Sequence, residues 1–318
     1  MNPMAIQGMR ERCAEQARRL QDRITEALAG ISGSVFQEDV WSRPGGGGGR
    51  TRVILEGELF EKAGVNFSEV HGELPPEFAR KLGEEAGRSQ TPSEKSDDPA
   101  DRQFYATGIS LVLHPRSPRV PTVHANFRYL EKGDTWWFGG GADLTPYRLY
   151  TEDAVHFHRV WKLVCDRHDP AYHPRFKKWC DEYFYLAHRK ETRGIGGIFF
   201  DYLSGDAERL FAFWKDAGEA FLEAYVPIVE RRRGETFPPD EREWQLHRRG
   251  RYVEFNLVYD RGTVFGLKTA GRVESILMSL PPLVRWGYHA DSMEAGKEDL
   301  SGPQAELLAV LKSPRDWV

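Results

Sequence analysis

The sequence predicts an α+β fold, with one large, mostly antiparallel sheet flanked by helices on both faces within a single domain of residues 1–318. Segments with the two-residue period of strands occur in runs, and so do helical segments, so the regular alternation of a parallel sheet is not expected. The chain is long enough for a substantial core. No internal repeat divides it, and nothing in the sequence forces a second domain.

The composition excludes several classes of protein. A net charge of -4 provides no overall basic field for nucleic acid or an anionic membrane. No window reaches the roughly 18 apolar residues of a membrane span, and the N-terminus lacks the apolar run of a signal peptide. Cys13, Cys165 and Cys180 are scattered without a CxxC motif, which predicts reduced packing thiols. We therefore expect a cytoplasmic protein without membrane insertion.

The first third of the chain begins with an amphipathic pattern. Apolar residues recur at helical spacing over residues 9–28, which predicts a surface helix within residues 1–33. A run of five glycines at residues 45–49 precedes a strand predicted at residues 52–56. The run lacks the GK[ST] ending of a phosphate loop. A mobile loop that covers a ligand and a plain flexible turn both fit it.

Residues 83–102 hold almost no large apolar side chains and are expected to form an exposed loop. Strands are then predicted at residues 105–113 and 120–129, joined by a turn at residues 114–118. The second strand alternates apolar and polar residues, so three polar side chains share one face. They are His124, Asn126 and Arg128.

A short strand is predicted at residues 136–138, and the three glycines at 139–141 then permit a turn or a close approach to a ligand. Asp143 would lie at the mouth of whatever the preceding strand lines. From spacing alone, a hairpin whose polar residues face water fits equally well.

The second half mixes helices and strands. Helices are expected at residues 153–167, 174–189 and 275–278, and one long amphipathic helix at residues 206–233. Strands are expected at residues 193–203, at residues 252–258, where YVEFNLV alternates strictly, and at residues 263–267.

Several long strings together resemble the oxygen-dependent coproporphyrinogen III oxidases. They include SLVLHPRSPRVPTVHANFR, WWFGGGADLTP, RGIGGIFFDYL and YVEFNLVYDRGTVFGLKTAGRVESILMSLPPLVRW. The resemblance extends from about residue 34 to the end. It implies oxidative decarboxylation of two propionates of coproporphyrinogen III to vinyl groups in haem biosynthesis, giving protoporphyrinogen IX. Molecular oxygen would be the co-substrate, and carbon dioxide and hydrogen peroxide would be released.

A flexible macrocycle with four carboxylates requires cationic anchors, and arginine holds a carboxylate by two charge-assisted bonds. Arg128, Arg261 and Arg272 are the candidate anchors. The resemblance also implies substrate contacts at a wider set of positions. These are Ser110, Asn126, Phe127, Arg128, Ala270, Gly271 and Arg272.

The resemblance implies that His124 is the proton donor, a role that suits imidazole chemistry. Asp143 is expected to hold or deprotonate a pyrrole N–H, and Asp260 is the competing base. A turn that bonds its own backbone is the alternative for Asp260 and Arg261.

Four histidines match positions assigned as divalent-metal ligands in bacterial members of the family. They are His114, His124, His158 and His188. Manganese would be the first choice. The alternative is catalysis without a metal, because His124 cannot easily serve as ligand and proton donor together. A core histidine bonded to a backbone group is the commoner outcome for His158 and His188.

Two other classes of function stay open at this level. One is a histidine-ligated non-haem metal oxygenase that acts on another substrate. The other is a non-catalytic tetrapyrrole carrier, which needs the anchors but no proton donor. The family also implies a homodimer with an interface at residues 252–287. Tyr202 departs from the family pattern, since FFDYL stands where relatives commonly have FFDDL.

Overall fold

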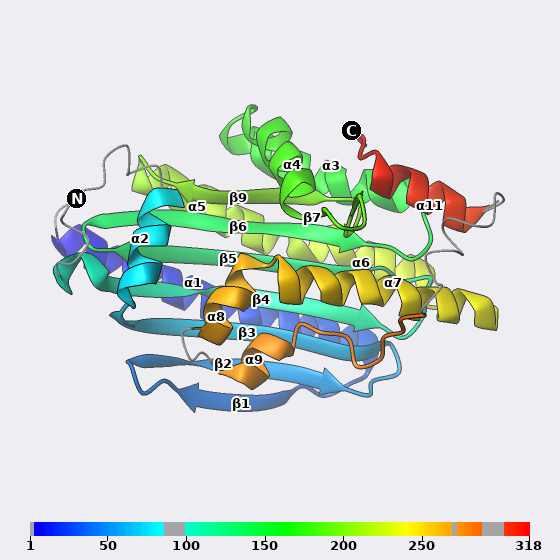
Figure 1. Cartoon of the computed structure of the whole chain (residues 1–318), viewed down its shortest axis with the longest axis horizontal. Helices are drawn as coiled ribbons and strands as arrows, with labels where there is room; N and C mark the ends of the chain where they lie inside the picture. Colours follow the sequence, from blue (N-terminus) through cyan, green and yellow to red (C-terminus); the bar gives the residue numbers. More distant parts are fainter. Residues whose placement is uncertain (1–2, 86–98, 269–271, 288–301) are drawn as a thin grey trace.

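A seven-stranded sheet organises the computed structural model, which describes residues 3–85, 99–268, 272–287 and 302–318. Its strand order is β1-β2-β3-β4-β5-β6-β9, and all neighbouring strands are antiparallel. Helices cover both faces (Figure 1). The predicted α+β class is confirmed.

The strands of the main sheet follow one another along the chain, except for β9. They are β1 (Gln37–Ser42), β2 (Gly47–Leu55), β3 (Phe60–Glu73), β4 (Gln103–Pro115), β5 (Thr122–Lys132), β6 (Thr135–Thr145) and β9 (Gly197–Leu203). A small second sheet pairs β7 (Tyr185–Leu186) with β8 (Glu191–Thr192).

Four helices lie behind the sheet in Figure 1: α1 (Pro3–Ser32), α3 (Thr151–His168), α5 (Ala207–Glu219) and α6 (Phe221–Arg232). Four lie in front of it: α2 (Pro76–Glu85), α7 (Pro239–Val258), α8 (Arg261–Lys268) and α9 (Val273–Leu277). The helix α4 (Tyr172–Tyr183) packs on β9, α11 (Pro303–Lys312) contacts β8, and the short 3-10 helix η2 (Pro99–Arg102) precedes β4.

The two faces of the sheet differ in chemistry. Alternate residues of β3 to β6 place an apolar set against α1, α5 and α6, and this set forms the main core. It includes Val65, Phe67, Ile109, Leu111, Phe127 and Phe138. The opposite face carries polar residues and glycines in register, such as Ser110 opposite Asn126 and Asn126 opposite Gly141. The predicted alternation of residues 122–129 is therefore confirmed.

The sequence suggested turns at the two glycine runs, and this prediction is wrong for most of the glycines, which lie in strands. The three glycines at residues 139–141 lie inside β6, and Gly47 to Gly49 lie inside β2. A Cβ at Gly139 would lie 2.6 Å from Oδ1 of Asp201 on β9, so a larger residue there would displace the carboxylate that pairs with Arg128. At Gly141 a Cβ would overlap the carbonyl oxygen of Ile198. The glycines thus permit close packing within the sheet.

Residues 252–258 and 263–267 were predicted wrongly as strands, since they belong to the helices α7 and α8. The end of α7 is buried on most of its circumference, so its polar residues do not mark one face and the alternation was misleading. The start of α7 carries a clear helix signal. Pro239 occupies the first turn and is followed by Asp240 and Glu241, which favour a helix N-terminus.

The long helix predicted at residues 206–233 is two helices, α5 and α6, with Ala220 between them. The break follows Gly218, a weak helix former, where a Cβ would lie 2.7 Å from a methyl of Leu20 on α1. The helix predicted at residues 174–189 ends at Tyr183 instead. The chain then forms the β7–β8 hairpin, whose turn holds Lys190 at φ 57.

The short helix at residues 275–278 and the N-terminal helix are confirmed with small shifts of their ends. Residues 83–85 end α2 and residues 99–102 form η2, whereas the rest of the predicted loop lies outside the described residues. The three cysteines are buried and free, as expected. None of the described helices is long and apolar enough to cross a membrane.

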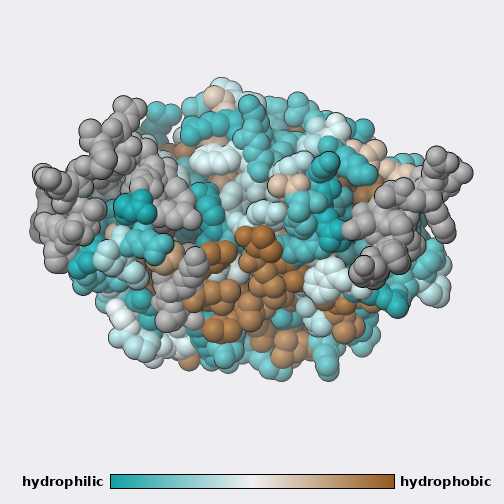
Figure 2. Space-filling view, viewed as in Figure 1, coloured by the Kyte–Doolittle hydropathy of each residue, from teal (hydrophilic) through white to brown (hydrophobic). Residues whose placement is uncertain are grey.

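The outer surface on the side of α7 to α9 is partly apolar. Figure 2 shows hydrophobic residues gathered near the centre of this face, over α8 and α9. Val273 and Leu267 are exposed large hydrophobic residues of these two helices.

Candidate active site

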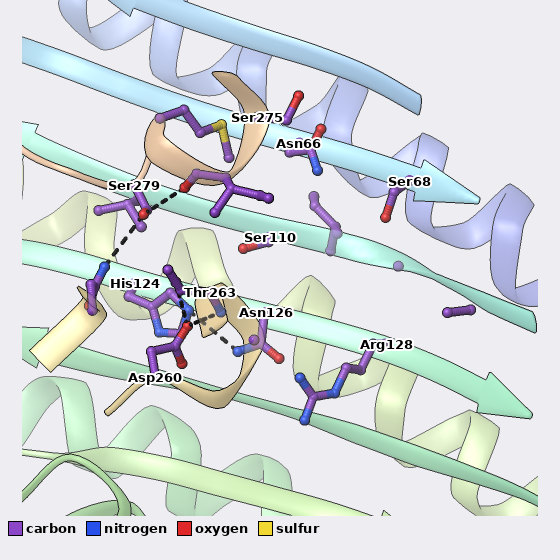
Figure 3. A pocket seen from close by; sticks show the side chains of 18 of the residues that line it. Asn66, Ser68, Ser110, His124, Asn126, Arg128, Asp260, Thr263, Ser275 and Ser279 are labelled. Carbon is purple, nitrogen blue, oxygen red and sulfur yellow. Dashed lines mark hydrogen bonds between the residues drawn. The ribbon is translucent and has the colours of Figure 1, made fainter. Parts of the chain in front are cut away.

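Two adjoining cavities lie between the polar face of the sheet and the helices α7 to α9. The first has a volume of about 280 Å³, and Figure 3 shows side chains that line it. The second has a volume of about 300 Å³. They share Ala106, Arg128, Leu130 and Gly262. Together they fall within the range of small-molecule sites, about 300–1,000 Å³.

Residues far apart in the chain line the first cavity. Asn66 comes from β3, Ser110 from β4, His124 and Asn126 from β5, and Asp260 from the start of α8. The labelled polar side chains face a common space in Figure 3. The register of the strands explains this, because Asn66, Ser110 and Asn126 are direct neighbours across three strands.

His124 is held from behind by a buried ion pair. Its Nδ1 donates to Oδ1 of Asp143 at 2.8 Å, and Asp143 occupies the position on β6 that faces His124. The guanidinium of Arg193 donates to the other oxygen of Asp143 at 2.7 Å and to Oδ1 of Asn256 at 2.7 Å. The Asp143 and Arg193 side chains are each 2% exposed, whereas that of His124 is 17% exposed. His124 is therefore the most exposed of these three side chains, and it lines the first cavity, whereas Asp143 does not.

The charge state of Asp143 follows from its partners. Burial alone would raise the pKa of Asp143, but the charge of Arg193 and the hydrogen bond from His124 outweigh burial and hold this pKa below its ordinary value. An ionised Asp143 accepts from Nδ1 and fixes the imidazole ring. The second ring nitrogen, Nε2, then lies 3.3 Å from Nδ2 of Asn126 at the edge of the cavity.

The predicted contact between Asp143 and substrate is not what this geometry favours. Asp143 lines neither cavity, and its side chain is only 2% exposed because His124 and Arg193 pack against it. The sequence missed Arg193, although it directly precedes the loosened Gly194-Ile195-Gly196-Gly197 stretch before β9. The position of Arg193 directly before these glycines was the feature of the sequence that could have identified it.

Asp260 lines the first cavity, and it also begins α8. Its Oδ2 accepts from the backbone N–H of Thr263 at 2.8 Å and from the Thr263 hydroxyl at 2.7 Å. Its Oδ1 accepts from the hydroxyl of Tyr183 at 2.9 Å. The predicted turn that bonds its own backbone is therefore present, as a helix N-cap. Three donors fix this carboxylate at the cavity wall.

Tyr183 connects this cap to the sheet. Its ring stacks on Phe199 of β9 with centroids 4.1 Å apart, and the guanidinium of Arg261 lies 5.1 Å from the same ring. One rigid aromatic side chain thus positions both Asp260 and Arg261.

The predicted anchors lie in different places. Arg128 donates to Asp201 at 2.6 Å where the two cavities meet, and Arg261 is 3.8 Å from the same carboxylate. Arg272 pairs with Asp39 on the edge strand β1 and does not line either cavity. Ala270 and Gly271 lie outside the described residues.

Ser110 and Phe127, two more residues predicted to contact the substrate, lie on opposite faces of the sheet. Ser110 lines the first cavity. The side chain of Phe127 points to the opposite face, where it packs near Trp161 in the core. Within the described part of the chain, Oδ1 of Asn126 and Nε of Arg128 are buried without a hydrogen-bond partner. A polar ligand in the cavity would satisfy such atoms.

The four candidate metal ligands have separate partners. Nε2 of His114 donates to the carbonyl of Ser279 at 2.8 Å, and Nε2 of His158 donates to that of Ile195 at 3.1 Å. His188 lies beyond the end of α4, where Nε2 donates to Glu254 at 2.7 Å. The described residues contain no group of three or more His, Cys, Asp or Glu side chains that could hold a metal. These histidines do not fit a common metal site.

The chain is similar to one family over nearly its whole length. A family model described as coproporphyrinogen III oxidase matches residues 12–317. Three relatives carry the name oxygen-dependent coproporphyrinogen-III oxidase. That of Prochlorococcus marinus strain SARG / CCMP1375 is 49% identical over 94% of this chain and 89% of its own. That of Prochlorococcus marinus strain MIT 9313 is 51% identical over 92% and 88%, and that of Synechococcus sp. strain CC9902 is 48% identical over 97% and 88%.

His158 generates a prediction about acid stability. Burial is the main cause that lowers the pKa of His158 to about 3, from about 6.5 in an unfolded chain. The unfolded state therefore binds a proton that the folded state excludes, so the contribution of His158 is complete above pH 6.5 and declines as the pH falls toward 3. As the pH falls from 7 to 5, the decline of this contribution should lower the free energy of unfolding by about 2 kcal/mol.

Urea unfolding of His158→Gln at the two pH values measures this contribution, since the pH-dependent loss should shrink by about 2 kcal/mol relative to the parent chain. His156→Gln is the matched control, because His156 lies on the same helix α3 and is only partly buried. An unchanged pH dependence in His158→Gln would contradict the prediction.

Proposed function

This chain belongs to the coproporphyrinogen III oxidase family, and on that premise we propose that the two adjoining cavities bind coproporphyrinogen III. The activity is that of an oxidoreductase of porphyrin biosynthesis, with molecular oxygen as co-substrate. The observation that carries the proposal is the position of His124, which is oriented by a buried carboxylate and exposed to a cavity with polar walls.

The chemistry requires one proton for each decarboxylation. A propionate loses its carboxylate as carbon dioxide from one methylene, and one hydrogen with two electrons from the other methylene, which is bonded to the pyrrole ring. A vinyl group remains. Oxygen takes these electrons and two protons to give hydrogen peroxide. The lost hydrogen accounts for one of the two protons, and the other has to be supplied. His124 supplies it, because Asp143 holds Nδ1 and leaves Nε2 toward the cavity.

The two aspartates take different roles in this proposal. Asp260 lies on the cavity wall, so it meets a pyrrole N–H of the substrate. Asp143 remains behind His124 and orients its ring. Asp143 as the direct anchor to the pyrrole nitrogens, which we expected from the sequence, would require the displacement of Arg193 or His124.

The carboxylates of the substrate need cations at the cavity walls. Arg128 and Arg261 face one carboxylate, Asp201, so the cluster of three carries one net positive charge where the cavities meet. A propionate that binds there gains charge-assisted hydrogen bonds, each worth roughly 1.5–3 kcal/mol. The role of Arg272 as an anchor stays a prediction, as do those of Ala270 and Gly271.

Turnover of chemically reduced coproporphyrinogen III by chelator-treated protein tests the function. Products are oxidised, separated by chromatography and measured by fluorescence. We expect protoporphyrin in air and none under nitrogen. Binding of substrate without any product would favour the non-catalytic carrier. Product that appears only after iron or manganese is restored would favour the histidine-ligated oxygenase.

His124→Ala should lower kcat by roughly 10²–10⁴ and change KM little, because the variant loses the proton donor and keeps the arginines. Steady-state kinetics of both proteins measure the effect. His156→Ala on the far layer of helices is the control and should behave as the parent chain. Unchanged turnover of His124→Ala would remove His124 from the mechanism.

We also propose a homodimer whose interface includes residues 252–287, as the family resemblance implies. Exposed large apolar side chains in this segment support the proposal, since patches of this kind mark interaction surfaces. They are Leu257, Val258, Leu267, Val273, Leu283 and Trp286. A cytoplasmic location stays a prediction from the sequence.

Sedimentation should give twice the chain mass of 36.4 kDa. Glutamate at both Leu267 and Val273 should move the protein toward the monomer, because charged side chains oppose burial at an interface. Either a monomeric parent chain at micromolar concentration or a doubly substituted chain that stays dimeric would contradict this interface.

A further inference from the structure

The cavity face of the sheet changes from polar to apolar at Arg128. Along β5, His124, Asn126 and Arg128 face the cavities in turn, and Leu130 follows them. The neighbours of Leu130 across the sheet are Ala106 on β4 and Trp137 on β6. The row formed by Ala106, Leu130 and Trp137 therefore carries no charged side chain.

The second cavity lies over this apolar row. Its walls come from β3, β4, β5, β6, β9 and the helices α2, α7 and α8. The apolar and aromatic members include Val70, Phe78, Phe104, Trp137, Tyr202 and Val264. Trp137 and Tyr202 pack together with ring centroids 5.4 Å apart. The departure from the family pattern at Tyr202 thus places an aromatic ring, rather than a second acid, in this wall.

The charges of the second cavity are arranged at one end. Among the described residues that line it, the cations are Arg128 and Arg261, and both are held at Asp201. The remaining carboxylate, Glu131, accepts from Arg10 of α1 on the opposite side of the sheet. Among the described lining residues, none other than Arg128 and Arg261 could pair with a ligand carboxylate that entered beyond Arg128, so burial of that carboxylate would be unfavourable. An uncharged group would gain from the same burial.

The proposed reaction creates such an uncharged group. One proton donor serves two propionates, so the decarboxylations occur one after the other. After the first, the macrocycle carries one vinyl group and three carboxylates. It has to bring a second propionate to His124, and the vinyl-bearing ring must then lie elsewhere. His124 and Leu130 are six residues apart on β5, about 20 Å at the rise of a strand, so the groove accommodates two different edges of the macrocycle.

We propose that the second cavity is a subsite for the vinyl-bearing edge of the monovinyl intermediate, and that it retains this intermediate for the second decarboxylation. The proposal rests on the proposed function. The cavity discriminates between the two steps because it accepts the vinyl group made in the first step and rejects the carboxylate that preceded it.

Val264→Asp tests the subsite by placing a carboxylate on the α8 wall of the second cavity, away from the lining of the first. The rate at which coproporphyrinogen III is lost is measured in the same assay, and it should fall by a smaller factor than the rate of the second decarboxylation. The ratio of released monovinyl tripropionate to divinyl product should rise about tenfold, equivalent to about 1.4 kcal/mol. When the monovinyl tripropionate is supplied directly, its KM should rise by a similar factor.

Val35→Asp is the matched control, since Val35 is 85% exposed and lines neither cavity, and it should leave the ratio unchanged. Val70→Thr adds a polar atom to the β3 wall at almost constant volume and should raise the ratio to a smaller extent. Sedimentation checks that each variant keeps the assembly of the parent chain.

The outcomes separate the two proposals. An inactive parent chain would contradict the proposed function. If the parent chain is active and the product ratio is unchanged in both Val264→Asp and Val70→Thr, only the subsite proposal is contradicted. An equal loss of both decarboxylations in both variants also overturns the subsite, because it would show a general defect of binding.

Discussion

The buried ion pair between Arg193 and Asp143 is the interaction on which the site depends. Asp143 belongs to β6, Arg193 follows β8, and the guanidinium also donates to Asn256 of α7, so one side chain joins the sheet to the helical layer. Two buried charges cost desolvation, and loss of either partner would leave the other uncompensated. Three aromatic rings around the guanidinium and its hydrogen bonds to Asp143 and Asn256 offset this cost. His124 takes its orientation from this rigid carboxylate.

The glycines and the strand register then determine the shape of the space in front of His124. Gly108 and Gly139 flank Arg128 in the sheet, so no side chain fills the floor beside its guanidinium. The helices α7 to α9 close the space from the other side, and Asp260 and Ser279 enter from them. A polar cavity and an apolar cavity meet at the Arg128–Asp201 pair. One face of one sheet thereby offers separate environments to charged and uncharged edges of a macrocycle.

Sequence patterns predicted the central hairpin well because its alternation reports a real difference between two faces. Residues 122–132 bury every second side chain in the core, so the period of the strand is visible. The same reasoning failed for residues 252–258, because that end of α7 is buried on most sides and its asparagine is satisfied by a tertiary partner. The strands β1 and β3 were missed, since charges and glycines interrupt their apolar residues. The four histidines looked alike as metal ligands and proved to have unrelated partners.

The sequence by itself determined the fold class, the family and most members of the candidate site, because long ordered motifs and strand alternation are local properties of the chain. His124, Asn126 and Arg128 were found on one face from spacing alone, and the fold places them there. Only the tertiary structure decided which aspartate reaches the cavity, since Asp143 and Asp260 differ in what covers them and not in their local sequence. Arg193 and the apolar cavity likewise appear only when β6, β9 and α7 come together, because burial and pairing are set by residues distant in the chain.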